Sequence, residues 1–238
     1  MAKVNLRNVC KSYLVSETEK KVISKLNADL DTGKRIAILG KSGCGKTTLL
    51  RIIAGLTDAE TGQVIIPEGL RVGYVFQEDR LFPWMTVEEN IAAVMKEKDQ
   101  AVAVTKEMLT LVGMQEFAKA YPHQLSGGMR KKVAFARCLA FRPDWILMDE
   151  PFSALDYFER NRLQDELLEI IKTQNKGFLL VTHQVEEAMK LAQELYIMGN
   201  GKLEKQFVIP AVCPNHDLDS PECIKMKKDI LYECKKFC

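Results

Sequence analysis

The sequence lacks any apolar run that approaches the roughly 18 residues a membrane-spanning helix needs. Its first residues, Met1 to Leu6, carry no apolar leader segment. We therefore expect the chain neither to cross a membrane nor to be exported, so that any membrane role requires a partner. Net charge is also small: 34 basic and 32 acidic side chains leave +2, which gives no indication of nucleic-acid binding.

Close cysteine pairs are missing as well. The cysteines are odd in number, seven in all, and Cys10, Cys44 and Cys138 are scattered. The sequence therefore predicts no disulfide framework and fits a reducing cytosol. The remaining cysteines gather in the C-terminal tail with one histidine: Cys213, His216, Cys223, Cys234 and Cys238. They include no C-x-x-C pair, which argues against zinc. We expect this tail to pack on the core or to cap a dimer.

The segments that are present alternate between strand-like and helical patterns. Of the 238 residues, 47% are hydrophobic and 28% charged, which is typical of one globular domain with subdomains. The alternation predicts an α/β fold with a largely parallel sheet. The predicted strands are Arg35–Leu39, residues 72–76, Trp145–Met148 and Phe178–Val181, and the predicted helices include Thr47–Ala54 and Arg160–Gln174. Residues 87–141 are helix-rich and predict a helical lobe inserted between two sheet-building halves.

The strongest motif is Gly-Lys-Ser-Gly-Cys-Gly-Lys-Thr at residues 40–47, which matches G-x-x-x-x-G-K-[ST]. A chance glycine-rich turn is the alternative, but the motif follows an apolar strand and opens a helix. Glycines let backbone N–H groups point at phosphates, and the helix N-terminus adds partial positive charge. Lys46 is suited to reach the β- and γ-phosphates, and the Thr47 hydroxyl to ligate Mg²⁺. The predicted nucleotide contacts in this loop are Gly40, Lys41, Ser42, Gly43, Cys44, Gly45, Lys46, Thr47 and Thr48.

Two neighbouring carboxylates end the predicted strand at Trp145–Met148. Ligands of open α/β sheets bind at such strand ends. Asp149 is placed to hold Mg²⁺ through water, and Glu150 to act as the base that orients the attacking water. The alternative is that the two acids only stabilise a helix N-terminus. This alternative is weak, because the pair ends a buried strand and Pro151 follows. No guanine-reading Asn-Lys-x-Asp occurs, so we expect ATP rather than GTP.

Leu125-Ser126-Gly127-Gly128-Met129 closely resembles the signature sequence of ABC ATPases, Leu-Ser-Gly-Gly usually followed by Gln. Ser126 and two glycines at a helix start form an anion cradle, although an ordinary Ser N-cap explains the segment equally well when it is taken alone. With the other motifs in order, the chain is similar to ABC ATPases over about residues 3–205. The resemblance implies head-to-tail dimers in which Ser126, Gly127 and Gly128 close over the partner's ATP.

The resemblance assigns roles to residues outside these motifs. It implies that Gln77 touches Mg²⁺ or the attacking water and meets the membrane partner. His183 is implied to contact the γ-phosphate, and Tyr13 to stack on adenine. The alternatives are that His183 is a polar residue whose hydrogen bonds are satisfied, and that Tyr13 is an ordinary aromatic residue of a strand. Ser153–Asp156 resembles the loop that crosses the dimer interface, and Gln184 departs from the Asp that many relatives have there.

The fold implied by the resemblance is that of a P-loop NTPase, with a RecA-like core sheet, an antiparallel β subdomain and an inserted helical subdomain. We expect the ABC ATPase domain to span residues 1–205. Its core is predicted at residues 1–86 and 142–205, its helical subdomain at 87–141, and a separate tail at 206–238.

Residues 81–87, Leu-Phe-Pro-Trp-Met-Thr-Val, resemble a segment of nitrate-, sulfonate- and taurine-type importers. The resemblance implies a motor subunit that hydrolyses ATP with Mg²⁺ to drive import of a small anionic solute. Its implied partners are a second copy in the ATP-bound state, two transmembrane permease subunits and, through them, a solute-binding protein, at the cytoplasmic face of the cell membrane. The alternatives are a non-transport ABC ATPase and a nucleotide-binding regulatory module without turnover, against which Glu150, Gln77 and His183 argue.

Overall fold

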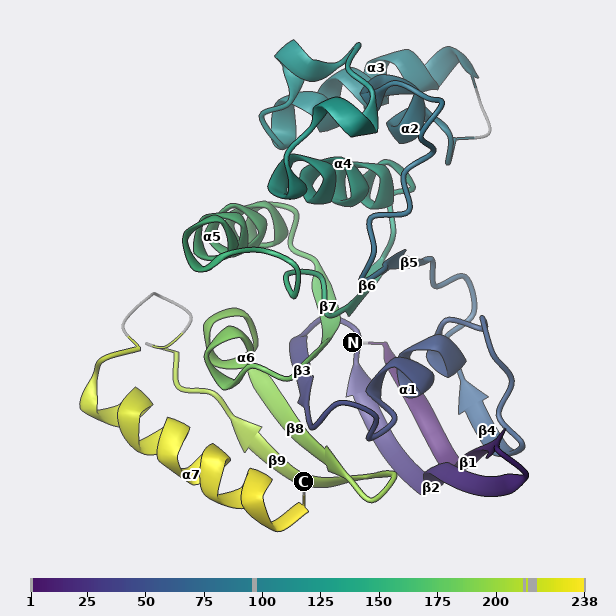
Figure 1. Cartoon of the computed structure of the whole chain (residues 1–238), viewed down its shortest axis with the longest axis vertical. Coiled ribbons are helices and arrows are strands. Elements are labelled where there is room, and N and C mark those ends of the chain that lie inside the picture. Colours follow the sequence, from purple (N-terminus) through teal and green to yellow (C-terminus); the bar gives the residue numbers. More distant parts are fainter. Residues whose placement is uncertain (1, 96–97, 212, 214–217, 238) are drawn as a thin grey trace. The chain divides into compact units, whose positions relative to one another are not determined.

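The computed structural model describes residues 2–95, 98–211, 213 and 218–237, and the chain divides into two compact units (Figure 1). Unit 1 comprises Met1–Leu70, Leu147–Asp149 and Lys176–Cys238, and unit 2 comprises Arg71–Ile146 and Glu150–Asn175. Strand β6 (Trp145–Asp149) therefore belongs to both units. Asp149 falls in unit 1 and Glu150 in unit 2. The predicted domain bounds follow a different division and stay a prediction.

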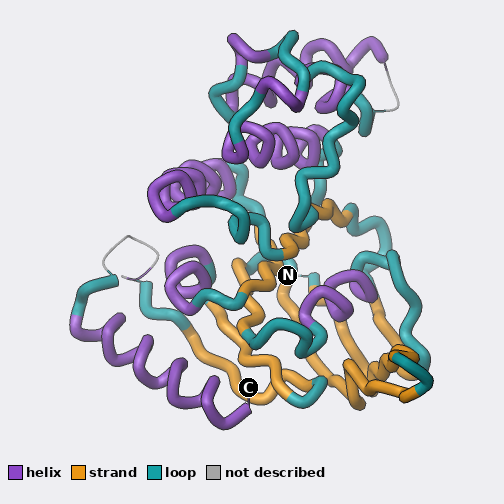
Figure 2. Tube along the Cα trace, viewed as in Figure 1, coloured by secondary structure: helices purple, strands orange, loops and turns teal. Residues whose placement is uncertain are grey.

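Unit 1 contains two groups of strands (Figure 2). An antiparallel sheet has the order β2 (Thr18–Asp31), β1 (Lys3–Val15), β4 (Thr61–Ile65). The second group has the order β7 (Gly177–Thr182), β3 (Arg35–Leu39), β8 (Glu194–Gly199), β9 (Lys202–Val208). β3 runs parallel to both neighbours, with Leu39 opposite Thr182 and Ile197. All of β7 is buried, as in the continuous apolar strands of covered parallel sheets.

A bulge explains the pattern of β1. Val4 and Leu6 are buried at the spacing of two that a strand gives, but the next buried residue is Val9. The pairing of β1 with β2 shifts register between Leu6 and Val9, and Asn8 in between has a φ of 51°. The extra residue moves Val9 back to the buried face, which keeps the apolar side of the sheet continuous.

Three helices of unit 1 are α1 (Lys46–Ile53), α6 (Val185–Leu191) and α7 (Pro221–Phe237). The sequence pattern indicates no element beyond Lys205, so α7 is a finding. It contacts α6, β8 and β9, and its Ile230 joins a buried cluster with Ala188 and Ile197 (Figure 1). Of the two expectations for the tail, packing on the core and capping a dimer, the first is confirmed.

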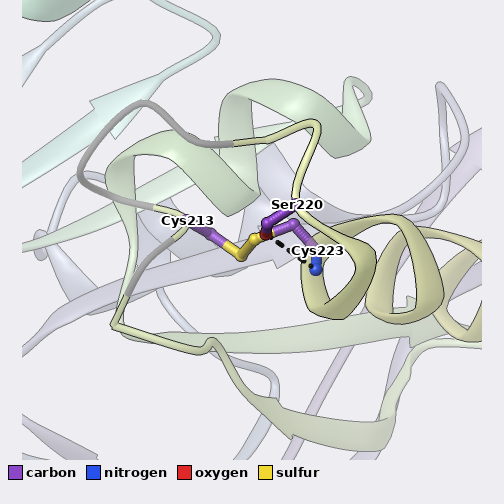
Figure 3. The surroundings of a disulfide bond; sticks show 3 residues. All are labelled: Cys213, Ser220 and Cys223. Carbon is purple, nitrogen blue, oxygen red and sulfur yellow. Dashed lines mark hydrogen bonds between the residues drawn. A yellow bond between two sulfur atoms is a disulfide. The ribbon is translucent and has the colours of Figure 1, made fainter.

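One disulfide corrects the expectation drawn from the cysteine spacing. Cys213 and Cys223 are bonded, with Cα atoms 6.0 Å apart, and Ser220 Oγ accepts a hydrogen bond from Cys223 N (Figure 3). Both cysteines are fully buried, and the bond ties the segment after β9 to the first turn of α7. The spacing of ten is uninformative because the pairing depends on that helix. His216 and Cys238 lie outside the described residues, so the prediction against a metal in the tail stays a prediction.

Unit 2 is mostly helical. Its elements are β5 (Val72–Val75), α2 (Val87–Ala92), α3 (Lys98–Leu111), the 3₁₀ turns η1 (Gln115–Phe117) and η2 (Pro122–Gln124), α4 (Gly127–Ala140) and α5 (Tyr157–Thr173). α4 contacts α2, α3 and α5. Described residues between 87 and 141 form no strand, as the helix-rich pattern predicts. In the part of the chain that the structure describes, no helix is long and apolar enough to span a membrane.

Candidate functional site

The phosphate loop lies between β3 and α1. Gly40 is buried, and a Cβ there would lie 2.6 Å from Met198 O and 2.7 Å from Cys44 Sγ. Gly45 has a φ of 107°, and a Cβ there would lie 2.7 Å from Val22 O. Glycine is therefore required at both positions, once for close packing and once also for the backbone conformation. This geometry turns the chain sharply from the strand into the helix.

Lys46 is folded back onto its own loop. Its side chain is 4% exposed, and Nζ donates hydrogen bonds to Gly40 O at 2.9 Å and Lys41 O at 3.0 Å. The ammonium is thus desolvated but bonded to neutral carbonyl oxygens. An anion placed in the loop would offer the ammonium a stronger partner, because the acceptor would then carry the opposite charge.

Thr47 and Asp149 meet within unit 1. Thr47 Oγ1 donates to Asp149 Oδ1 at 2.8 Å, and Asp149 is 3% exposed. The contact joins the first turn of α1 to the end of β6 and brings together two residues that the sequence separately assigns to Mg²⁺. Two oxygen ligands this close fit a hard cation such as Mg²⁺.

The other predicted residues of unit 1 are placed by the strands. Leu39 and Thr182 are opposite each other in parallel strands, so Gly40 and His183 leave the sheet at the same edge. His183 is exposed there. Tyr13 lies on β1 of the antiparallel sheet, with its side chain 39% exposed and Lys11 Nζ 5.5 Å from the ring centroid. Within the loop Lys41, Ser42 and Gly43 are exposed, while Cys44 and Thr48 are half-buried.

Gln77 and Glu150 both lie in unit 2, and hydrogen bonds through Ser153 connect them. Gln77 Nε2 donates to Ser153 Oγ at 3.4 Å, and Ser153 Oγ donates to the backbone oxygen of Glu150 at 3.0 Å. Lys131 Nζ donates to the backbone oxygen of Gln77. Glu150 itself has a φ of 42°, an uncommon value for a residue with a side chain. The turn after β6 therefore holds the predicted base and the predicted glutamine in one hydrogen-bonded network.

The second anion cradle of the chain is the start of α4. Ser126 is its N-cap, and Ser126 Oγ accepts from Met129 N at 3.2 Å. Glu159, from the first turn of α5, accepts from Gly128 N at 3.0 Å and from Ser126 Oγ at 3.3 Å. Glu159 is not among the residues that the sequence motifs predict for this site. Its only signal is Asp156-x-x-Glu159, which resembles a local capping box, and Asp156 does cap α5.

A strand, a glycine loop and a helix with Lys46 and Thr47, together with Asp149 at a buried strand end, define a P-loop nucleoside triphosphatase. The model of the ABC transporter family matches residues 23–153. The chain belongs to the ABC transporter family, whose ATP-binding proteins are ATPases coupled to transport.

Individual relatives agree with this assignment. The chain is 42% identical over 212 residues to an aliphatic sulfonates import ATP-binding protein, SsuB, of Bacillus cereus, covering 85% of this chain and 84% of that protein. It is 39% identical to the taurine import ATP-binding protein TauB of Pelagibacter ubique, covering 88% and 86%. A dimeric post-hydrolysis structure of the ATP-binding cassette MJ0796 with ADP and Pi matches with a TM-score of 0.77 and 28% identity, covering 87% of this chain and 99% of that chain. The predicted P-loop NTPase fold is confirmed.

Proposed function

We propose that the chain is the ATP-hydrolysing motor subunit of an importer for a small anionic solute, of the nitrate, sulfonate or taurine kind. ATP is bound and hydrolysed between two copies arranged head to tail. The observation that carries the proposal is that one chain holds two anion cradles, the phosphate loop in unit 1 and the Ser126–Gly128 turn in unit 2. A head-to-tail dimer uses both, because each phosphate group is enclosed by one cradle of each kind.

Within one subunit the phosphate loop binds the β- and γ-phosphates, and Lys46 exchanges its carbonyl partners for phosphate oxygens. Thr47 and Asp149, whose oxygens lie 2.8 Å apart, hold Mg²⁺ together with Gln77. The ion, when bound, neutralises charge on the phosphates. Tyr13 stacks on the adenine, and its half-exposed ring is available for this.

Hydrolysis requires a base, and Glu150 takes that role by accepting a proton from the attacking water. The chain of hydrogen bonds from Gln77 through Ser153 to the Glu150 backbone supports the assignment, because it orients the base and the glutamine together. His183 contacts the γ-phosphate from the edge of the sheet where the phosphate loop begins. These are the residues that a regulatory module without turnover would not need.

The names of the relatives support the importer branch: one imports aliphatic sulfonates and another taurine. We place the subunit at the cytoplasmic face of the membrane, with two permease subunits that receive a solute-binding protein. A groove of about 480 Å³ in unit 2 supports permease docking. Its lining includes Tyr74, Phe76 and Phe82, and Arg80 Cζ lies 4.1 Å from the Phe76 ring centroid. Aromatic and arginine side chains are enriched where partners bind.

The test uses two inactive mutants. Lys46→Ala lacks the phosphate lysine, and Ser126→Arg fills the opposite cradle. In a mixed dimer one site carries both defects and the other carries none, so phosphate release should partly return on mixing. If Ser126 acted within its own chain, both sites would remain broken and mixing would restore nothing.

The control is a dimer of wild-type and Lys46→Ala subunits, with differential tags to confirm heterodimers and the permease present to favour assembly. Tagged Lys46→Ala/Ser126→Arg heterodimers that stay inactive, where this control is active, would refute the head-to-tail arrangement. A wild-type protein that binds ATP but releases no phosphate would favour the regulatory module. Robust turnover without any permease partner in the cell would favour a non-transport ABC ATPase.

A further inference from the structure

The cradle at the start of α4 holds a carboxylate from the same chain. Glu159 Oε1 accepts from Gly128 N at 3.0 Å and from Ser126 Oγ at 3.3 Å. These are the N–H and O–H donors that the proposed function assigns to a phosphate of the partner's ATP. One oxygen of Glu159 receives both, as a phosphate oxygen would.

The second glycine of the cradle makes room for this carboxylate. A Cβ at Gly128 would lie 2.2 Å from Glu159 Oε1 and 2.7 Å from Glu159 Cδ. By contrast, the closest atom to a Cβ at Gly127 would be Leu155 Cδ2, at 3.4 Å. Any side chain at position 128 would therefore move Glu159 out of the cradle, whereas position 127 would tolerate a small one.

Two basic side chains near the cradle on α4 are paired with other acids. Arg130 Nε lies 3.3 Å from Asp79 Oδ2, and Lys132 Nζ lies 2.5 Å from Glu166 Oε2. Among the described residues, Glu159 makes no ion pair, and its two hydrogen bonds to the cradle are the polar contacts of its carboxylate. The charge of Glu159 is therefore balanced by hydrogen-bond donors at a helix N-terminus, the environment that also attracts phosphate.

We propose that Glu159 is an internal anion which occupies the Ser126–Gly128 cradle of the separate subunit, and that the partner's ATP displaces it when the dimer closes. The inference rests on the proposed function, in which this cradle receives phosphate from the other subunit. A carboxylate and a phosphate cannot accept from the same N–H at about 3 Å without strong like-charge repulsion. Glu159 therefore sets the ATP concentration at which two subunits close, without touching the reacting atoms.

The experiment measures ATP-driven dimerisation in a Glu150→Gln background, where hydrolysis does not deplete the complex. Sedimentation velocity gives the MgATP concentration for half-maximal dimer at fixed protein concentration. Glu159→Gln keeps the shape and removes the charge, so we expect that concentration to be roughly twofold to fivefold lower, the range for a carboxylate at a helix N-terminus. Glu159→Ala should shift it in the same direction, which guards against an effect of the amide itself.

Glu169→Gln is the matched control, because it removes the same charge from the same helix at a side chain that is 71% exposed. It should leave the midpoint unchanged, and ATP binding by dilute single subunits should be equal in all variants. An unchanged or higher midpoint in Glu159→Gln and Glu159→Ala would overturn the inference. If the Glu150→Gln parent does not dimerise with ATP, or if Ser126→Arg does not block its dimerisation, the proposed function fails instead.

Discussion

The two anion cradles of this chain are built alike, but the side chain bonded within each carries the opposite charge. Each lies at the N-terminus of a helix, α1 in unit 1 and α4 in unit 2. The N-cap of α1 is Gly45, which offers no side-chain cap, and the ammonium of Lys46 bonds to the carbonyls of its own loop. The N-cap of α4 is Ser126, whose hydroxyl caps the helix, and the carboxylate of Glu159 accepts hydrogen bonds from Ser126 Oγ and Gly128 N.

This difference determines what each cradle should bind without help. In the phosphate loop, an incoming anion takes the place of the neutral carbonyl oxygens bonded to Lys46, so binding gains attraction between opposite charges. In the Ser126 cradle, an incoming anion replaces another anion, so little is gained until the whole interface forms. We therefore expect a single subunit to bind nucleotide through unit 1, and unit 2 to contribute only when two subunits close.

The largest expected effect is on turnover, and it comes from a substitution at Glu150, which lies in neither cradle. Glu150→Gln should lower turnover about a hundredfold to ten-thousandfold, because it removes the general base, while ATP binding stays within about twofold. Phosphate release and equilibrium nucleotide binding measure the two quantities. Glu169→Gln serves as the charge control, and normal turnover by Glu150→Gln would exclude Glu150 as the base.

The second prediction separates the cradles directly. Lys46→Ala should weaken ATP binding by single subunits roughly tenfold to a hundredfold, the size of a lost charge-assisted hydrogen bond. Ser126→Arg should leave that affinity unchanged and still stop turnover. Titration of dilute protein with a fluorescent ATP analogue gives both affinities. The comparison between the cradles breaks down if Ser126→Arg weakens binding as much as Lys46→Ala does.

The third prediction compares one glycine from each cradle. Gly45→Ala should lower the free energy of unfolding by at least about 2 kcal/mol, because φ is 107° and the new Cβ meets the Val22 carbonyl. Gly128→Ala should change it by less than about 1 kcal/mol, because the neighbour is the movable end of Glu159. Urea denaturation measures both. Equal losses would mean that Glu159 is held as rigidly as the backbone.

The smallest expected effect concerns the thiol in the phosphate loop. Cys44 is half-buried there, so N-ethylmaleimide should modify it slowly and MgATP should protect it, as peptide mass spectrometry can follow. Cys138 should stay unmodified, because burial raises the pKa of its thiol to about 12 and little thiolate forms at neutral pH. Modification of Cys44 at the same rate with and without MgATP would contradict nucleotide contact at that position.

Local patterns predicted the parts of the structure that local chemistry determines. The predicted strand Arg35–Leu39 is β3, and the predicted helix Thr47–Ala54 differs from α1 by one residue at each end. The phosphate loop could be predicted because strand, turn and helix are contiguous. The contact between Thr47 and Asp149 agrees with the separate assignment of both residues to Mg²⁺, because each follows directly from a local motif.

Other features depend on residues far apart in the chain. The structure places the start of α5 at Tyr157, whereas the sequence predicts Arg160. The apolar pattern misses the first turn because its aromatic residues Tyr157 and Phe158 are 65% and 82% exposed and do not lie on the buried face. Glu159 reaches a turn more than thirty positions away, and no motif of the Ser126 segment includes it. The bond between Cys213 and Cys223 requires α7, which the weak pattern beyond Lys205 does not indicate.

The position of β3 between β7 and β8 has a consequence for synthesis on the ribosome. β3 ends at Leu39, whereas its partners begin at Gly177 and Glu194. At about 5–20 residues per second, translation leaves this apolar strand without its neighbours for roughly eight to thirty seconds. The helices of unit 2 emerge within that interval, ending with α5 at Thr173. We therefore expect the nascent chain to fold the Ser126 cradle first and to acquire a supported phosphate loop only after β7 and β8 have emerged.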